Sequence, residues 1–240
     1  MNERIPILTV EQMREVDRLM VETFGIQLTQ MMENAGHGLA ALARDRFLSG
    51  DPRGSRVLIL AGSGGNGGGG LVAGRRLHTW GAEVIIFLSR KPEEMDGVPA
   101  QQLSILQAME GVGIIPPGGD QSFPQADLIL DALIGYSLKG APRGATARLI
   151  ERATDHKASI LSLDVPTGVE AGTGTVHTPH IRADATLTLA LPKRGLFVEE
   201  TCPCVGELYL ADIGVPPELY GRMGISVGPI FAEQDLMRLY

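Results

Sequence analysis

The chain alternates short runs of apolar residues with longer amphipathic stretches. Six apolar runs have the length and composition of strands, at residues 56–60, 83–88, 127–130, 159–163, 184–190 and 207–210, and residues 112–115 form a shorter one. Apolar positions with helical spacing lie between them, at residues 68–80, 98–109 and 145–154. Because most strand runs are continuous rather than alternating, we expect an α/β fold with a mostly parallel sheet, buried between two layers of helices.

Two further helices are predicted before the first strand. Thr9 and Gln12 have the spacing of a capping box, which places a helix start at residue 9. A second helix is expected over residues 28–48, with Met31 and Met32 facing the core. No linker long enough to separate two domains is found before residue 215, so we expect a single domain.

Composition narrows the class of protein. The chain has 240 residues, 44% of them hydrophobic, which is enough for a well-filled core. The formal net charge is −7 without a basic cluster, and this does not suggest binding to nucleic acid. Cys202 and Cys204 are one residue apart, a spacing that suits neither a usual disulfide nor a four-ligand zinc site. The first residues lack a signal-peptide pattern and no apolar run could span a bilayer, so we expect a cytoplasmic protein with no membrane partner.

The most informative stretch is the glycine-rich segment VLILAGSGGNGGGGL at residues 57–71. Seven of the nine residues from 62 to 70 are glycine, and they lie between a predicted strand and a predicted helix. This order of elements makes a backbone cradle for an anion, most often a phosphate. A flexible linker or an ordinary tight turn explains the segment less well, because both flanks are apolar and a turn needs fewer glycines. Each glycine in a helix lowers its stability by about 1 kcal/mol relative to alanine. Since several glycines occur together here, we expect another group to approach this backbone closely.

Two aspartates follow other predicted strands. Asp131 ends the run DLIL and Asp164 ends the run SILSL, and glycine-rich chain follows each of them. Because parallel strands share one carboxyl edge, residues 61–70, 131–144 and 164–174 should converge on one pocket. Each aspartate has an alternative role as the cap of the turn that follows it. The amide of Asn66 and the hydroxyl of Thr167 add neutral oxygens, and this donor set suits a hard cation.

Several familiar enzyme signatures are missing from the sequence. The five histidines form no convincing ligand pattern, and no Walker lysine follows the glycines, which argues against an NTPase. Ser89-Arg90-Lys91 stands where a dehydrogenase usually has an acidic residue for the ribose. This tripeptide suits either a 2′-phosphate or a charged surface turn, and we favour the turn.

Six motifs occur in an order that resembles one known family. They are MMENAG (31–36), LAGSGGNGGGGLVAGRRL (60–77), DLILDALIGYSLKG (127–140), LSLDVPTGVEAGTG (161–174), ADATLTLALPKRGL (183–196) and GELYLADIGVP (206–215). Over residues 9–220 the chain resembles the NAD(P)H-hydrate epimerase family, or YjeF N-terminal domain. The resemblance implies a Rossmann-like three-layer αβα sandwich, usually a homodimer. It also implies an isomerase that interconverts the R and S hydrates of NADH and NADPH (NADHX and NADPHX) in nicotinamide cofactor repair.

The resemblance also assigns residues to roles. It implies that the substrate contacts Asp164 and residues 65–69 and 135–141, which are Gly65, Asn66, Gly67, Gly68, Gly69, Gly135, Tyr136, Ser137, Leu138, Lys139, Gly140 and Ala141. Asn66, Asp131 and Thr167 match the positions of the family's potassium ligands. We expect Asp164 to be the acid–base group at the C6 hydroxyl of the hydrate, with Lys193 as a second catalytic candidate.

Two departures from the family pattern motivate an alternative. Gly65 replaces an asparagine of the family's loop and Gly69 replaces an aspartate. A module of the same fold that binds a nucleotide or another protein without catalysis would tolerate these changes. An NADP-dependent reductase is a poorer third candidate, because no tyrosine–lysine pair is evident.

The domain organisation is expected to be simple. Residues 1–230 form the epimerase-like domain, and residues 231–240 have no expected partner within it. This tail resembles the lead-in to a dehydratase domain, so the dehydratase that acts on the repaired epimer is an expected partner, fused or separate.

Overall fold

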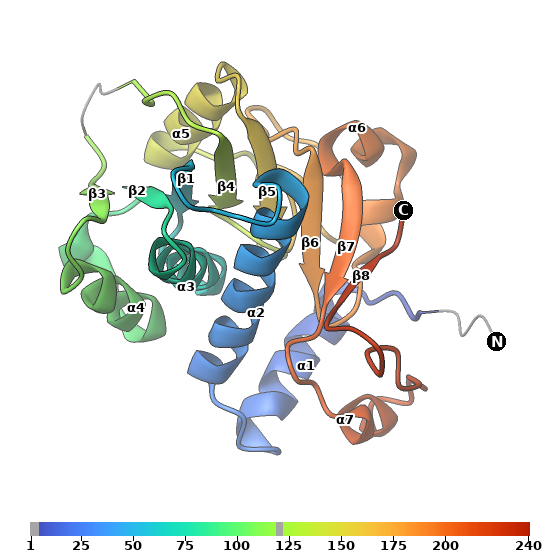
Figure 1. The fold of residues 1–240 in the computed structure, drawn as a ribbon. Coiled ribbons are helices and arrows are strands. Elements are labelled where there is room, and N and C mark those ends of the chain that lie inside the picture. The colour runs from blue at the N-terminus through green and yellow to red at the C-terminus, as the bar shows by residue number, and fades with distance from the viewer. Residues whose placement is uncertain (1–4, 119–121) are drawn as a thin grey trace.

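The fold is an α/β sandwich built around one sheet (Figure 1). The computed structural model describes residues 5–118 and 122–240. Within these ranges, eight strands pair in the order β3-β2-β1-β4-β5-β6-β7-β8. Their bounds are β1 Arg56–Ala61, β2 Glu83–Leu88, β3 Gly113–Ile115, β4 Leu128–Ala132, β5 Ser159–Leu163, β6 Ala185–Leu189, β7 Glu207–Ala211 and β8 Leu236–Arg238. Neighbouring strands from β3 to β7 are parallel and β8 is antiparallel to β7, so the expected mostly parallel sheet is confirmed.

Helices cover both faces of this sheet. Their bounds are α1 Val10–Glu22, α2 Leu28–Leu42, α3 Gly65–Thr79, α4 Gly97–Gln107, α5 Gly144–Thr154, α6 Cys202–Val205 and α7 Pro217–Arg222. Helices α2, α3 and α4 lie against one face, and α5 lies against the other (Figure 1). None of the helices in the described ranges is both long and apolar enough to cross a lipid bilayer.

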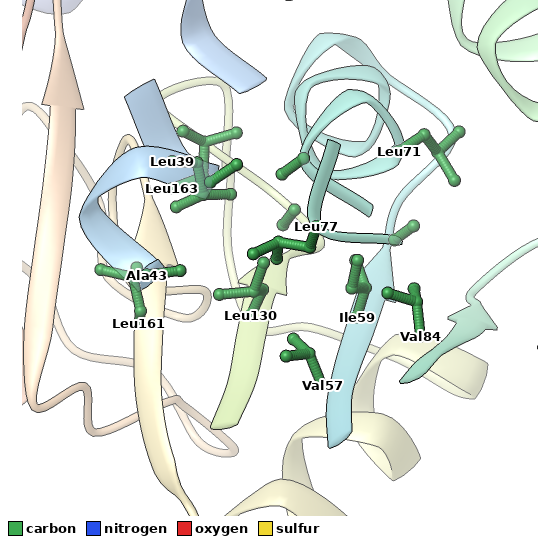
Figure 2. Packing of buried hydrophobic residues seen from close by; sticks show 14 of the residues in the cluster. Leu39, Ala43, Val57, Ile59, Leu71, Leu77, Val84, Leu130, Leu161 and Leu163 are labelled. Atoms are coloured by element: carbon green, nitrogen blue, oxygen red, sulfur yellow. The ribbon is translucent and has the colours of Figure 1, made fainter. Parts of the chain in front are cut away.

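The alternation of side chains along the strands fills both interfaces. In β1, Val57 and Ile59 face α2 and α3, where they pack with Leu39, Leu71 and Leu77 (Figure 2). Leu58 and Leu60 of the same strand face the opposite side, in a cluster that includes Leu149 and Ile150 of α5. Because both faces of the strand are buried, the run has to be apolar throughout, as the sequence indicated.

The N-terminal helices differ in how closely they follow prediction. The capping box of α1 is confirmed, with the Thr9 hydroxyl accepting from the Gln12 N–H at 3.2 Å and Gln12 Oε1 accepting from the Thr9 N–H at 2.8 Å. The helix expected over residues 28–48 ends as an α-helix at Leu42 and continues as a single π-helical turn, Ala43–Phe47.

Three local expectations were wrong. The helix after the glycines begins at Gly65 rather than at residue 68, so the glycines form its first turns. Asp131 lies inside β4 rather than beyond its end, paired in register with Leu60 and Ser162. Residues 231–240 do have a partner within the domain, because β8 pairs with β7 and the Leu239 N–H donates to the Leu208 carbonyl at 2.7 Å.

Strand order determines where a ligand can enter. From β1 the chain moves outward to β2 and β3, then returns to β4 on the other side of β1. The connections after β1 and β4 therefore diverge, and they leave a crevice at the carboxyl edge of the sheet between these strands.

Candidate active site

A cavity of about 630 Å³ lies at this edge of the sheet. Its walls include residues 62–66 after β1, residues 133–137 after β4, and Asp164 after β5. The predicted convergence of the three segments is therefore confirmed. Residues from α1 and α2 close the cavity on another side, and its size is within the range of about 300–1,000 Å³ that is usual for ligand sites.

The N-terminus of α3 faces this cavity. Gly62, Ser63, Gly64, Gly65 and Asn66 line it, and α3 begins at Gly65 with Gly64 as its N-cap. The first N–H groups of a helix have no partner within the helix, and they carry the positive end of its dipole. This wall is therefore suited to the phosphates of a nucleotide.

The next glycines have a different role from the one expected. Gly67, Gly68 and Gly69 are buried and do not line the cavity. A Cβ at Gly67 would lie 1.8 Å from the carbonyl oxygen of Gly62, and one at Gly69 would lie 2.7 Å from Leu163 Cδ2. What approaches this backbone closely is the protein itself.

Asp164 and Lys193 form a buried ion pair in the cavity wall. Lys193 is completely buried and its Nζ donates to Asp164 Oδ1 at 2.6 Å, to the Leu189 carbonyl at 2.8 Å and to Thr188 Oγ1 at 3.3 Å. These bonds use all three ammonium protons. The N–H of Tyr136 donates to Asp164 Oδ2 at 2.8 Å. Each oxygen of the Asp164 carboxylate therefore accepts one of these hydrogen bonds from the protein and can accept another.

Asp164 has the backbone of a tight turn. Its φ is +67°, a value that aspartate and asparagine tolerate better than most residues, and its N–H donates to the Leu187 carbonyl at 2.7 Å. The carboxylate of Asp164 does not cap its own turn, which was the alternative role. Both of its oxygens instead accept hydrogen bonds from residues far along the chain.

Asp131 is placed differently. It is completely buried, is not among the residues that line the cavity, and accepts four hydrogen bonds. The donors are Thr167 Oγ1 at 2.6 Å, the Thr167 N–H at 2.8 Å, Ser162 Oγ at 2.9 Å and the Leu133 N–H at 3.3 Å. Burial raises the pKa of the Asp131 carboxyl, while the bonds from Thr167 and Ser162 oppose that shift. The carboxylate thereby joins the ends of β4 and β5.

Asn66 links this cluster to the cavity. A Cβ on Gly135 would lie 2.7 Å from Asp164 Oδ2 and 3.1 Å from Asn66 Oδ1, so both side chains flank Gly135. The preceding residue, Ile134, donates its N–H to Thr167 Oγ1 at 3.1 Å. Among the described residues, Asn66 Nδ2 is buried without a hydrogen-bond partner. Asn66 and Thr167, two of the residues expected to bind potassium, thus border the same short segment after β4.

The loop at residues 135–141 is only partly in the cavity. Gly135, Tyr136 and Ser137 line it, whereas Leu138, Lys139, Gly140 and Ala141 do not. The end of the loop is held from outside, because the Gly140 N–H donates to Glu170 Oε1 at 3.3 Å.

Three charged residues of the cavity wall were not singled out as site residues from the sequence. Asp17 comes from α1, and Arg143 precedes α5. Arg90, which we assigned to a surface turn, also lines the cavity beside Ser89. The signal for Arg90 was its place after the second strand, which is where dinucleotide-binding folds contact the ribose.

These features define a nucleotide-binding class of α/β protein, with a Rossmann-like sheet and a helix N-terminus at its switch point. Residues 28–195 match the family model described as YjeF-related protein N-terminus, and the chain belongs to this family. The predicted resemblance is thereby confirmed.

Three similar proteins illustrate the range of relatives. A protein of Dehalogenimonas lykanthroporepellens named NAD(P)H-hydrate epimerase is 47% identical over 225 residues, covering 93% of this chain and 88% of that protein. One from Moorella thermoacetica, named bifunctional NAD(P)H-hydrate repair enzyme Nnr, is 37% identical, and the match covers 89% of this chain but 41% of that protein. The crystal structure of the yeast protein YNL200c has a TM-score of 0.82 at 25% identity, covering 98% of this chain and 100% of that one.

Proposed function

We propose that this protein is an isomerase that interconverts the R and S epimers of NADHX and NADPHX. The observation that carries the proposal is the pairing of Asp164 with Lys193 in a cavity that also receives the N-terminus of α3. Relatives named NAD(P)H-hydrate epimerase, similar over almost the whole chain, support it. The cavity thus combines an anion-binding wall with an acid–base group, as epimerisation of a dinucleotide hydrate requires.

In this proposal two parts of the cavity wall have different tasks. The N–H groups at the start of α3, with Arg90 and Arg143 nearby, bind the phosphates of the substrate. Asp164 as carboxylate takes the proton of the C6 hydroxyl while the C6–N1 bond breaks, and it returns that proton when the ring closes on either face. Alternatively, Asp164 as carboxylic acid gives a proton to the C6 hydroxyl, which leaves as water and adds again; neither route involves net oxidation. Lys193 donates all its protons to protein acceptors, and its bond to Oδ1 holds the Asp164 side chain in one orientation.

Asp164→Asn tests the proposed acid–base role. Asparagine keeps the size of the side chain and tolerates positive φ, but it cannot exchange a proton. We expect the enzyme-dependent exchange between the R and S hydrates, followed by two-dimensional exchange NMR, to fall by about 10²–10⁴-fold. Circular dichroism and the thermal midpoint serve as the control for folding. Exchange at the wild-type rate would remove Asp164 from the reaction.

The non-catalytic alternative is less well supported. It was motivated by the replacement of the family's aspartate with Gly69, but Gly69 is buried against Leu163 and forms no part of the cavity wall. Gly65 does line the cavity, and glycine still offers its N–H to a phosphate. A chain that binds NADP at this edge and never accelerates exchange would favour the alternative.

We also propose a potassium ion beside Asn66, Asp131 and Thr167. The donors are an amide, a carboxylate and a hydroxyl, to which the Ile134 carbonyl adds a fourth oxygen, since it lies 3.3 Å from Thr167 Oγ1. One carboxylate in such a set suits a monovalent ion. The unpaired amide end of Asn66 supports this fit, because half a turn of the side chain exchanges its nitrogen and oxygen. The ion would supply positive charge that holds the loops after β1, β4 and β5 together.

Thermal unfolding in different salts tests the potassium site. We expect the unfolding midpoint to rise by about 5 °C in KCl relative to LiCl at equal ionic strength, because the ion binds the folded protein alone. Thr167→Val removes one donor oxygen and should abolish this difference, whereas the matched variant Ser137→Ala should retain it. Equal midpoints for the wild type in both salts would contradict the site.

The setting of the protein is a further part of the proposal. We propose a cytoplasmic homodimer that works with an NAD(P)H-hydrate dehydratase. The much longer bifunctional relatives support the link to a second repair activity, since this chain matches only 41% of the Moorella protein. Light scattering at several concentrations tests the dimer, and a constant monomer mass would contradict it.

A further inference from the structure

One carboxylate of the cavity has no role in the proposed reaction. Asp17 is the eighth residue of α1, and it lines the cavity together with Tyr136, Asp164 and Lys193. The hydroxyl of Tyr136 donates a hydrogen bond to Asp17 Oδ2, a contact between residues 119 positions apart. The N-terminal helix is thus joined to the loop that follows β4.

Tyr136 continues this connection to the acid–base group. Its backbone N–H donates to Asp164 Oδ2 at 2.8 Å, and Lys193 holds the other oxygen, Oδ1, at 2.6 Å. The contacts therefore run from Asp17 through the whole of Tyr136, side chain and backbone, to Asp164. A displacement of the Tyr136 ring would move the N–H that orients the carboxylate.

The contacts around Tyr136 hold its side chain in one orientation. The phenol donates and Asp17 Oδ2 accepts, and this bond fixes the Tyr136 ring in one orientation. The ring is half-buried among apolar side chains of α1 and of the sheet edge, so the carboxylate provides its polar anchor. Gly135 before it has no room for a side chain between Asn66 and Asp164, so the loop packs closely against both side chains.

We propose that Asp17 is a positioning residue for epimerisation, which acts by holding Tyr136 so that the Tyr136 N–H orients the Asp164 carboxylate toward the substrate. The inference rests on the proposed function and extends it to a helix outside the family's motifs. Tyr136 also presents its ring to the cavity, beside the place where the hydrated nicotinamide ring has to meet Asp164.

The test combines single and double variants of this pair. Asp17→Ala and Tyr136→Phe each remove the same hydrogen bond, and we expect each to lower kcat for epimer exchange about ten-fold with little change in KM. The double variant Asp17→Ala/Tyr136→Phe should be no slower than the slower single variant, because the bond is lost only once. Asp17→Asn keeps an acceptor oxygen and should retain most of the rate. Glu15→Ala is the matched control, since it removes an exposed carboxylate of the same helix, and it should leave kcat unchanged.

The outcomes separate this inference from the proposed function. If the wild type does not accelerate exchange, the proposed function itself fails. If the wild type is active and Tyr136→Phe has the wild-type kcat, the inference is overturned, even where Asp17→Ala fails to fold. Effects of the two single variants that multiply in the double variant, or a kcat for Glu15→Ala as low as for Asp17→Ala, would also overturn it.

Discussion

At the residue scale, the cavity contains two carboxylates with different surroundings. Asp164 receives a charged partner, Lys193, whereas Asp17 receives a neutral phenol. Burial raises the pKa of Asp17, while the bond from Tyr136 and the charge of Lys193 lower it and the charge of Asp164 raises it further. The phenol is affected as well, because burial and the bond to Asp17 raise the pKa of Tyr136. Both members of this pair therefore hold their protons more firmly than in water.

The raised pKa of Asp17 predicts how stability depends on pH. The folded protein binds the Asp17 proton more tightly than the unfolded chain, whose ordinary pKa is 3.8. The stability from this group is therefore present below that pH and is lost as pH rises through the folded pKa. Asp17→Asn cannot titrate, so the free energy of unfolding of the wild type minus that of the variant should decrease as the pH rises above about 4. Urea unfolding at several pH values measures it, and a difference that grows with pH would contradict the prediction.

Sequence reasoning found the residues whose signal is local in the sequence. Asp164 follows an apolar run and precedes glycines, and both facts are readable along the chain. Asp17 could not be found in this way, since it looks like any polar residue of an amphipathic helix and its partner is 119 positions away. The burial of Asp131 was equally hidden, because its four hydrogen bonds come from residues of two later segments as well as its own.

At the element scale, α3 shows how a helix can begin with glycines and remain ordered. Its first turns pass so close to the β1–α3 connection and to α2 that side chains would collide there. The sequence indicated a close approach but not its partner, because a phosphate and a neighbouring backbone exclude a Cβ in the same way. The sequence also could not reveal β8, since three residues are too few for an apolar pattern.

Alanine substitutions separate the two kinds of glycine in this element. Gly67→Ala would place its Cβ 1.8 Å from the Gly62 carbonyl oxygen, and backbone cannot yield cheaply. At Gly65 the nearest atom is Met32 Cε at 3.7 Å, an ordinary contact. We expect Gly67→Ala to lower the free energy of unfolding by about 3 kcal/mol or more and Gly65→Ala to change it by less than about 1 kcal/mol. Urea denaturation measures both, and equal effects of the two substitutions would show that steric room is not what selects glycine here.

At the scale of the whole molecule, β8 completes the sheet. It covers the edge of β7 by antiparallel pairing. Backbone bonds at the two ends of the pairing run from the N–H groups of Asp212, Leu239 and Leu208 to the carbonyls of Asp235, Leu208 and Tyr240. The Tyr240 hydroxyl also donates to the Leu196 carbonyl at 2.9 Å. The last residues are therefore part of the domain, whatever they precede in longer relatives.

Removing β8 should destabilise the protein measurably. A chain that ends at Glu233 loses at least the three backbone bonds named above, each worth about 1 kcal/mol, and we expect the thermal midpoint to fall by about 6–12 °C or more. Arg238→Ala is the control, because it keeps the pairing of β8 and removes only side-chain contacts, which are an ion pair with Glu207 and a hydrogen bond to the Tyr240 carbonyl. A truncated chain with the wild-type midpoint would show that the β7–β8 pairing adds no stability.

The overall architecture was predictable because it follows from the continuous apolar sequences of strands that are buried on both faces. Continuous apolar strands separated by amphipathic helices allow few arrangements other than a parallel sheet between helical layers. The shape of the cavity was not predictable, since Arg90, Arg143 and Asp17 reach it from elements that the motifs do not include.

The walls of the cavity are drawn from residues as far apart as Met13 and Ile213. The complete cavity therefore exists only when the N-terminal helices and the last parallel strand are both in place. A bound nucleotide consequently opposes unfolding of the molecule as a whole, and a cell rich in intact or damaged cofactor would keep this protein folded longer than one that lacks it.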